Sequence, residues 1–165
     1  MRASEKREMV QLSITIVEES PNSADAVQLI TELDEYLMSH PYTPESRHAF
    51  SVDKLVREGV AFFVARYDGA AAGCAGLKMF GSDYGEVKRM YVRPAHRGLG
   101  LGKLMLNRLA EYARERQVSL LRLETGIYQA EAIGLYERYG FQRRPPFGEY
   151  REHPLSVYFE KSLAE

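Results

Sequence analysis

A chain of 165 residues with 45% hydrophobic and 27% charged residues has the composition of one globular domain that buries its own core. Its 22 basic and 23 acidic residues give a net charge of −1, which predicts no nucleic-acid partner and no anionic membrane surface. One cysteine, Cys74, and four scattered histidines predict no intrachain disulfide and no metal site.

The start of the chain is polar and has no apolar signal region, and no run approaches the roughly 18 apolar residues of a spanning helix. We therefore expect no membrane partner and a cytoplasmic location. We also expect a flexible N-terminus over residues 1–10 and one domain over residues 11–165.

The first half of the chain combines strand and helix patterns. Ser23 has the side chain of a helix N-cap, the proline-containing segment 40–44 ends that helix, and Asp68-Gly69 indicates a hairpin turn. The elements expected here are a strand over 12–16, a helix over 26–37, a short helix over 52–57, and strands over 60–66 and 71–79.

The second half contains the clearest helix pattern, over residues 99–117. Pro94 ends the strand before it, and Gly140 stands where a helix C-terminus favours glycine. The other elements expected here are strands over 84–92, 120–125, 141–143 and 157–161 and a helix over 130–139. The order of about seven strands and about four helices predicts an α+β single domain with a mixed central sheet.

Three glycines, Gly98, Gly100 and Gly102, stand within five residues directly before the long helix. Glycine disfavours a helix start, so we expect a ligand to offset this cost. Glycines let a backbone approach a ligand closely, and the first N–H groups of a helix attract anions, so a diphosphate fits the turn. The Walker A pattern fails because Arg97 and Leu104 occupy its Gly and Ser/Thr positions, and the Gly-x-Gly-x-x-Gly pattern fails at its third glycine.

The segment Arg97-Gly98-Leu99-Gly100-Leu101-Gly102 resembles the (Gln/Arg)-x-x-Gly-x-(Gly/Ala) signature of the GNAT superfamily of N-acetyltransferases. Residues 90–94 resemble that family's preceding strand, and 135–141 resemble its late Leu-Tyr-x-x-x-Gly-Phe helix. The resemblance implies a GNAT-like fold, acetyl-CoA as the cofactor, and an acyltransferase that acetylates a primary amine by direct attack in a ternary complex.

The resemblance also implies two catalytic residues. Glu86 would be the general base, directly or through water, and Tyr136 would be the acid that protonates the departing thiolate. The alternative for Glu86 is an exposed strand carboxylate paired with Lys88 or Arg89. The alternative for Tyr136 is a core aromatic on an amphipathic helix.

Cofactor contacts are implied by the same resemblance. The backbone of Met90, Tyr91 and Val92 would pair with the pantetheine arm on a strand that splays at a bulge, and the N–H of Met90 would polarise the thioester carbonyl. Gln129 stands where many members carry Asn. The residues expected around the diphosphate are Arg97, Gly98, Leu99, Gly100, Leu101, Gly102 and Lys103.

The acceptor side is less defined. In the family's fold, the regions that usually bound the acceptor carry both charge signs and several aromatics here, which favours a small polar acceptor, although solvated loops would have the same composition. These residues are His40, Tyr42, Glu45, Arg47, His48, Phe147, Glu149, Tyr150 and Arg151. Two alternatives stay open, namely a protein or peptide N-acetyltransferase and a non-catalytic CoA-binding regulatory module. A homodimer also stays open, Cys74 is expected to be a packed small residue, and His96 is expected on a surface loop.

Overall fold

The computed structural model describes residues 13–46 and 50–164. The predicted flexible start, Leu12 of the first strand, Arg47 and His48 lie outside the described residues. The elements are β1 (Ile14–Glu18), α1 (Ala24–Met38), η1 (Pro44–Ser46), α2 (Val52–Arg57), β2 (Ala61–Tyr67), β3 (Ala70–Phe80), β4 (Tyr84–Val92), η2 (Pro94–His96), α3 (Leu101–Glu115), β5 (Leu120–Gly126), α4 (Ala130–Tyr139), β6 (Gln142–Arg144) and β7 (Ser156–Ser162).

The predicted order of strands and helices is confirmed, and the two short 3-10 turns η1 and η2 are additions that the sequence did not predict. The Ser23 hydroxyl accepts the N–H of Ala26 as the N-cap of α1, and Gly140 ends α4 with a φ of 104°. Helix α3 begins two residues later than expected because Gly100, with a φ of 81°, is its N-cap.

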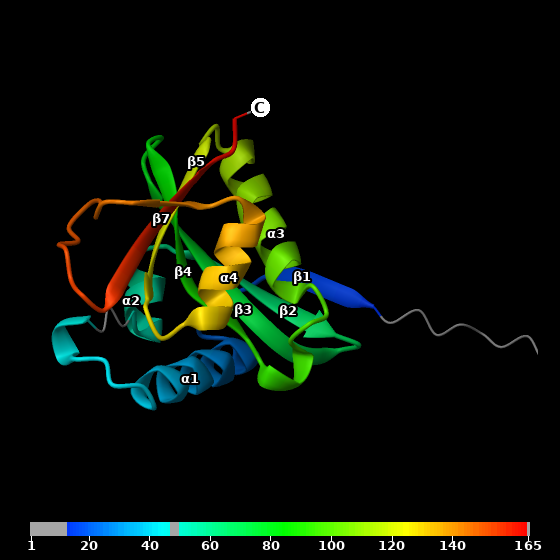
Figure 1. Ribbon diagram of the computed structural model, residues 1–165. Helices are drawn as coiled ribbons and strands as arrows, with labels where there is room; N and C mark the ends of the chain where they lie inside the picture. The colour runs from blue at the N-terminus through cyan, green and yellow to red at the C-terminus, as the bar shows by residue number, and fades with distance from the viewer. Residues whose placement is uncertain (1–12, 47–49, 165) are drawn as a thin grey trace, which may run out of the picture.

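The strands form one seven-stranded mixed sheet in the order β1-β2-β3-β4-β5-β7-β6. Only β4 and β5 run parallel, since α3 crosses over between them, and every other neighbouring pair is antiparallel. Helices α1 and α2 cover one face of the sheet, and α3 and α4 cover the other (Figure 1). The predicted α+β single domain is therefore confirmed.

Each layer of helices has its own core. Phe63, Leu77 and Leu121 are completely buried under α3 and α4, whereas Phe62 and Cys74 are buried under α1 and α2. This alternation along β2 follows from the two-residue period of a strand whose both faces are covered. Burial of these side chains fixes the register of the central strands and thus the positions of the polar residues between them.

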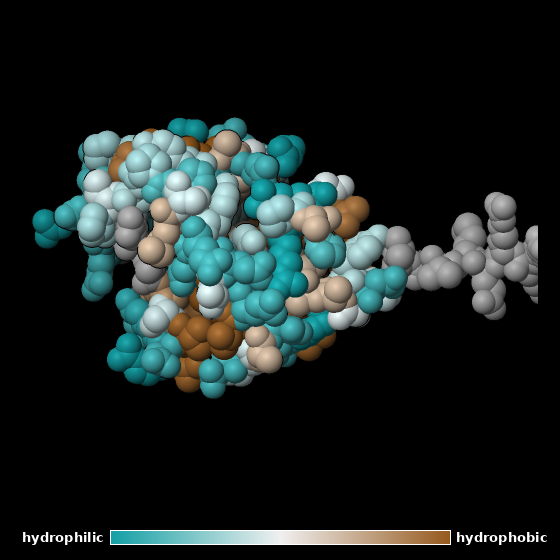
Figure 2. Space-filling view, turned by 90° about the horizontal axis from the view of Figure 1, so that it is seen from below, coloured by the Kyte–Doolittle hydropathy of each residue, from teal (hydrophilic) through white to brown (hydrophobic). Residues whose placement is uncertain are grey.

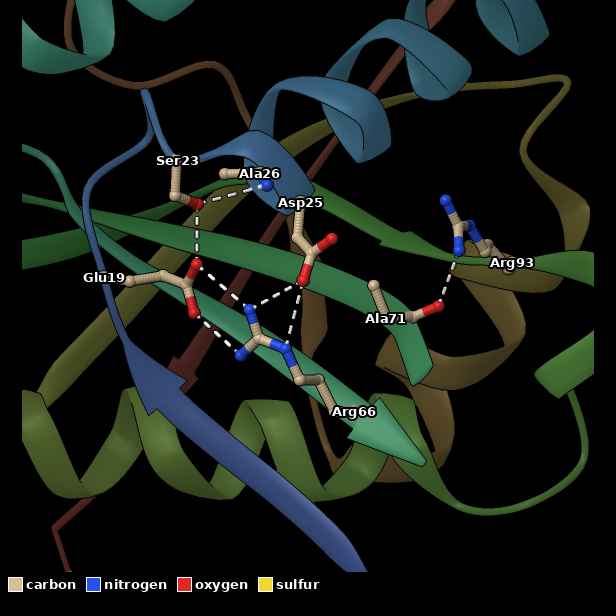
Figure 3. Close-up of polar contacts among 7 residues, drawn as sticks. All are labelled: Glu19, Ser23, Asp25, Ala26, Arg66, Ala71 and Arg93. Carbon is tan, nitrogen blue, oxygen red and sulfur yellow. Dashed lines mark hydrogen bonds and ion pairs between the residues drawn. The ribbon is translucent and has the colours of Figure 1, made fainter. Parts of the chain in front are cut away.

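The junction of β1 and α1 is tied to β2 by one arginine. Arg66 donates to both carboxylate oxygens of Glu19, at 2.8 and 3.2 Å, and to Asp25 at 2.9 Å (Figure 3). The hydrogen bond from Arg66 lowers the pKa of the Glu19 carboxyl below its ordinary value. This network holds the start of α1, and α1 forms one wall of the cavity described below.

The outer side of α1 is polar, so the face of the molecule that it covers is mainly hydrophilic, with apolar side chains gathered in small patches (Figure 2). Within residues 13–46 and 50–164, no helix combines the length and the apolar character that crossing a membrane requires.

Candidate functional site

Strands β4 and β5 separate after two residue pairs, Gly85 with Leu121 and Glu86 with Arg122. Strand β4 then carries one extra residue opposite β3, because Gly76 pairs with Lys88 but Cys74 pairs with Tyr91. The splay at a bulge that the resemblance implied is therefore present. It leaves an opening between two strands in the middle of the sheet, where ladder hydrogen bonds end and a ligand can take their place.

Arg89 is the residue that forms the bulge, and its backbone is left-handed with a φ of 55°. Its guanidinium donates to the carbonyl of Ile30, at 3.2 Å, and to Asp34, both on α1. The Cys74 thiol donates to the Arg89 carbonyl at 3.3 Å. An uncommon backbone conformation is thus held from two sides, which fixes the path of Met90 and Tyr91.

The glycine-rich turn has the geometry of an anion site. Gly98 and Gly100 both have a φ of 81°, which a side chain rarely allows, and Gly100 offers no side-chain cap to the helix. The first N–H groups of α3 are therefore left for a ligand. Gly102 has a different reason to be glycine, because a Cβ there would lie 2.6 Å from Leu135 of α4.

A groove of about 570 Å³ runs from this turn to the opening between the strands. Nearly all the predicted cofactor residues line it: Met90, Tyr91, Val92, Arg97, Gly98, Gly100, Leu101, Gly102, Lys103 and Gln129. Leu99 does not, because its side chain is 43% exposed on the turn. The carbonyl of Val92 accepts a hydrogen bond from Arg97 Nε at 3.2 Å, and Arg97 also pairs with Glu131 at 2.8 Å.

A second cavity, of about 370 Å³, adjoins the groove on the α1 side of the opening. The two spaces share four wall residues: Leu33, Met90, Gln129 and Ala132. Polar residues from several helices, strands and loops line the second cavity, among them Asp34, Tyr42, Glu86, Lys88, Glu124, Thr125, Tyr136 and Tyr150. A reacting group in this cavity would lie directly beyond the end of the groove.

Glu86 is buried and only 2% exposed, so the alternative of an exposed carboxylate is wrong, although the expected ion pair with Lys88 is present. Its Oε2 atom accepts a hydrogen bond from the Tyr150 hydroxyl at 2.8 Å, and the Lys88 ammonium lies 3.0 Å from the same hydroxyl. The other alternative partner, Arg89, pairs with Asp34 instead. Glu86, Lys88 and Tyr150 thus form a closed polar triad in the cavity wall.

Glu124 is a carboxylate that the sequence analysis did not select. It lies on β5 two residues after Arg122, which pairs with Glu86, so the two carboxylates share a face of the sheet. Burial raises the pKa of Glu124 to about 7. The contact with Ser156 and the charge of Lys88 oppose this rise, and the charge of Glu86 adds to it. A carboxyl with a pKa near neutrality is well matched to accept and release a proton at pH 7.

Tyr136 extends from α4 to the cavity at the point where β4 and β5 separate. It is 4% exposed and packs on Phe141 and Phe159, so it is a core residue as well as a cavity residue. Its hydroxyl has no hydrogen-bond partner among the described residues. Burial raises its pKa above the ordinary phenol value, so the hydroxyl keeps its proton at neutral pH.

Tyr42 closes the cavity from the loop after α1. Its hydroxyl accepts the N–H of Tyr128 at 2.9 Å and lies 3.3 Å from the amide nitrogen of Gln129. Gly126 leaves room for this contact, because a Cβ there would lie 2.0 Å from the Tyr42 hydroxyl. The buried Gln129 therefore stands at the boundary between groove and cavity, with its amide bonded toward the acceptor side.

The positions of Cys74, His96 and Phe147 can also be compared with the sequence-based expectations. Cys74 is buried, as expected of a packed residue, and burial raises the pKa of its thiol to about 12. His96 is not on an exposed loop: it lies in η2, is half-buried against Tyr67 and lines the groove. Phe147 is core rather than acceptor surface, since it is 4% exposed among Tyr84 and Tyr158.

Comparisons with known proteins agree with this geometry. Residues 27–141 match the Acetyltransferase (GNAT) family model. The chain is 44% identical over 152 residues to an "IAA acetyltransferase" of Azospirillum brasilense, an alignment that covers 92% of this chain and 99% of that protein.

Two solved structures show the same fold. One is a Klebsiella pneumoniae protein assigned as an acyl-CoA N-acyltransferase, with 36% identity, a TM-score of 0.77 and coverage of 92% of this chain and 98% of that one. The other is the PaiA N-acetyltransferase of Thermoplasma acidophilum in complex with coenzyme A, with 20% identity, a TM-score of 0.73 and coverage of 91% and 99%.

Proposed function

The chain belongs to the GNAT family of acetyltransferases and uses acetyl-CoA, and from that premise we propose that it acetylates a primary amine of a small molecule. The observation that carries the proposal is the junction of the two spaces at Met90, Gln129 and Ala132. Glu86, Glu124 and Tyr136 all line the cavity beyond that junction. Proton acceptors and a proton donor thus stand where an amine would meet the acyl group.

The size and closure of the cavity favour a small acceptor. A volume of about 370 Å³ is typical of small-molecule sites. Tyr42 closes one side of the cavity and the Tyr150 loop closes another, so an extended peptide has less room to enter. A buried carboxylate, Glu86, and a half-buried one, Glu124, next to a cavity also favour a cationic acceptor, because an ammonium group offsets their desolvation.

Direct attack requires that no acetyl-enzyme forms. The only cysteine, Cys74, is buried, donates its thiol hydrogen bond to Arg89 and lines neither space. Burial raises the pKa of this thiol to about 12, so it holds its proton at neutral pH and is a poor nucleophile. This supports attack by the acceptor amine within a ternary complex.

Acetyl-CoA supplies an activated thioester, and the side chains of the cavity would manage the protons. An alkylammonium has a pKa near 10.4, so it must lose a proton before it attacks. We assign Glu124 to accept that proton, since its pKa of about 7 suits the task. The sequence-based assignment of Glu86 as the base stays a prediction, and its ion pair with Lys88 and hydrogen bond from Tyr150 make it the less available of the two carboxylates.

The remaining roles follow from position. The N–H of Met90, next to the bulge, would donate to the oxyanion that forms on the carbonyl, and Tyr136 would donate its proton to the departing thiolate. Gly98, Gly100 and the first N–H groups of α3 would hold the diphosphate, with Arg97 and Lys103 beside it.

The test is a thiol-release assay with acetyl-CoA and a panel of amines, amino acids, aminoglycosides, peptides and IAA, followed by mass spectrometry of the acetylated product. The proposal expects release with a small primary amine. Release with peptides alone would support the peptide alternative, and tight acetyl-CoA binding without any transfer would support a regulatory module.

A further inference from the structure

A third space, of about 1060 Å³, lies on the other side of the triad of Glu86, Lys88 and Tyr150. It is bounded by α2, by the ends of β3 and β4, and by residues 148–153 of the segment that joins β6 to β7 (Figure 1). The same three side chains line the 370 Å³ cavity, so a wall one side chain thick separates the two spaces. We call this third space the lysine cleft.

Three ammonium groups converge inside the lysine cleft on one aromatic ring. The Nζ atoms of Lys54, Lys88 and Lys78 lie 4.4, 4.6 and 5.6 Å from the centroid of Phe50, which is buried. An aromatic face attracts a cation, but three like charges around one ring repel each other in a partly desolvated space.

Two of the three charges are neutralised within the protein. Lys78 pairs with Glu58 at 2.8 Å and Lys88 pairs with Glu86. Among the described residues, no carboxylate lies within ion-pair distance of Lys54, whose ammonium contacts the Phe50 ring and acts on Glu58 only at longer range. Of the three lysines around Phe50, Lys54 is thus the one with no carboxylate at ion-pair distance among the described residues, and its ammonium is the one placed to meet an anion in the cleft.

The other charges of the cleft belong to exposed or half-buried groups. Glu45, Glu149, Glu152 and Arg151 are exposed, and His153 is half-buried. Solvent and salt screen exposed charges strongly, whereas the half-buried Lys54 acts on a ligand at shorter range. The exposed carboxylates weaken the attraction for a distant anion but leave the local preference at Lys54.

We propose that the acceptor carries an acidic group as well as its amine, and that Lys54 and its neighbours in the lysine cleft bind that group. The inference rests on the proposed amine acceptor and specifies its class: an amino acid or an aminoalkyl acid. The amine would lie in the 370 Å³ cavity beside Glu124 and Tyr136, and the carboxylate would lie near Phe50. The carbon chain would cross the wall by taking the place of the 3.0 Å contact between Lys88 and Tyr150. Lys54 would then select acceptors by charge.

The test compares ω-amino acids of two to six carbons with alkylamines of the same length. The preference for the acid, measured as the ratio of the two kcat/KM values, is expected to exceed tenfold for the best length in the parent enzyme. Lys54→Met keeps most of the packing on Phe50 and removes the charge, and we expect the ratio to fall about tenfold, as for the loss of one charged hydrogen bond. Lys161→Met is the matched control, because Lys161 also lies over an aromatic ring, that of Tyr139, but lines neither space.

Phosphate is the other acidic group that lysines bind well, so 2-aminoethyl phosphate is included. A Lys54-dependent preference for it over the carboxylate would identify the acidic group as a phosphate. Equal kcat/KM values for acids and amines in the parent, or equal ratios in Lys54→Met and Lys161→Met, would overturn the proposal.

A binding measurement separates this proposal from the proposed amine acetylation. Calorimetry with 5-aminopentanoate and pentylamine, at saturating CoA, needs no transfer. Tighter binding of the acid that is lost in Lys54→Met supports the lysine cleft even if no amine is acetylated. Indistinguishable affinities for acid and amine contradict the lysine cleft even if amines are acetylated. Melting curves and CoA affinity verify that each variant is folded, and Lys54→Gln serves as the second variant if Lys54→Met unfolds.

Discussion

The substitution Glu124→Gln tests whether Glu124 or Glu86 is the general base, because the two carboxylates are expected to affect rate and stability differently. Gln keeps the shape of the side chain but neither accepts a proton nor carries a charge. If Glu124 is the base, kcat/KM falls by about 10²–10⁴-fold at neutral pH. The fall of kcat/KM below pH 7 that reflects Glu124 in the parent enzyme should disappear in Glu124→Gln.

Glu124→Gln should lower the rate but raise the stability of the folded protein above neutral pH. Burial raises the pKa of Glu124 from 4.5 to about 7, so the folded protein binds more protons than the unfolded chain between these values. Stability therefore decreases as pH rises through this window, by at most about 3 kcal/mol at pH 8. Glu124→Gln removes this decrease, so its Tm should equal that of the parent near pH 4 and exceed it by several degrees at pH 8.

Glu86→Gln is the matched control. It leaves Lys88 without its partner carboxylate in the wall, and we expect a loss of about 1–3 kcal/mol at pH 7. The charge of Glu86 raises the pKa of Glu124, so its removal should move the acidic limb of the pH profile to lower pH without abolishing it. Melting curves at pH 4 and 8 and kcat/KM from pH 5 to 9 measure both effects. Loss of the acidic limb in Glu86→Gln and its retention in Glu124→Gln would refute this reasoning and make Glu86 the base.

Four further predictions concern other parts of the fold. Tyr136→Phe should lower kcat about tenfold or more with little change in acetyl-CoA affinity, and equal kcat values would leave Tyr136 a core residue only. Gly100→Asp should weaken acetyl-CoA binding at least tenfold in calorimetry, because it sets a carboxylate at the anion turn, and unchanged affinity would place the diphosphate elsewhere. Gly126→Ala should displace Tyr42 and raise KM for the acceptor more than KM for acetyl-CoA, and equal changes would argue against Tyr42 as the closure of the cavity. Glu19→Gln should cost about 1 kcal/mol at pH 7. Because the pKa of Glu19 is lowered in the folded state, that cost should start to shrink below the ordinary carboxyl pKa and vanish once pH has passed the lowered one; a cost that does not change with pH would count against the ion pair with Arg66.

Local patterns in the sequence were sufficient to predict most of the fold. These patterns are short-range signals: the alternation of apolar and polar residues along each strand, the Ser23 cap, the hairpin turn at Asp68 and the glycine after α4. Each lies where it was expected. The turns η1 and η2 were missed because three residues are too short for a periodic pattern.

The wall of the acceptor cavity depends on long-range contacts, and for that reason the sequence predicted it only in part. Glu86 was found on the strand that leads into the glycine-rich turn, and Tyr136 was found through the Leu-Tyr-x-x-x-Gly-Phe motif of the late helix. Glu124 was missed because its significance arises only when β5 pairs in parallel with β4 and places it on the same face as Glu86. The alternation of Leu121 and Leu123 with Arg122 and Glu124 was the available signal, but it does not reveal which strand is the neighbour.

Likewise, Lys54 and Phe50 of the lysine cleft stand far from β4 in sequence, and only the packing of α2 brings them to Lys88. The bulge at Arg89 has no marker in the sequence, since its left-handed backbone is held by Asp34, Ile30 and Cys74 from other elements.

The proposed mechanism requires that an amine in the 370 Å³ cavity attacks the acetyl group directly in a ternary complex. Initial rates of CoA release, measured while acetyl-CoA and the best amine acceptor are both varied, test it most directly. Direct transfer predicts double-reciprocal lines that intersect, because both substrates must be bound before CoA leaves. Parallel lines would contradict it, since they would mean that the acetyl group passes first to a residue of the protein.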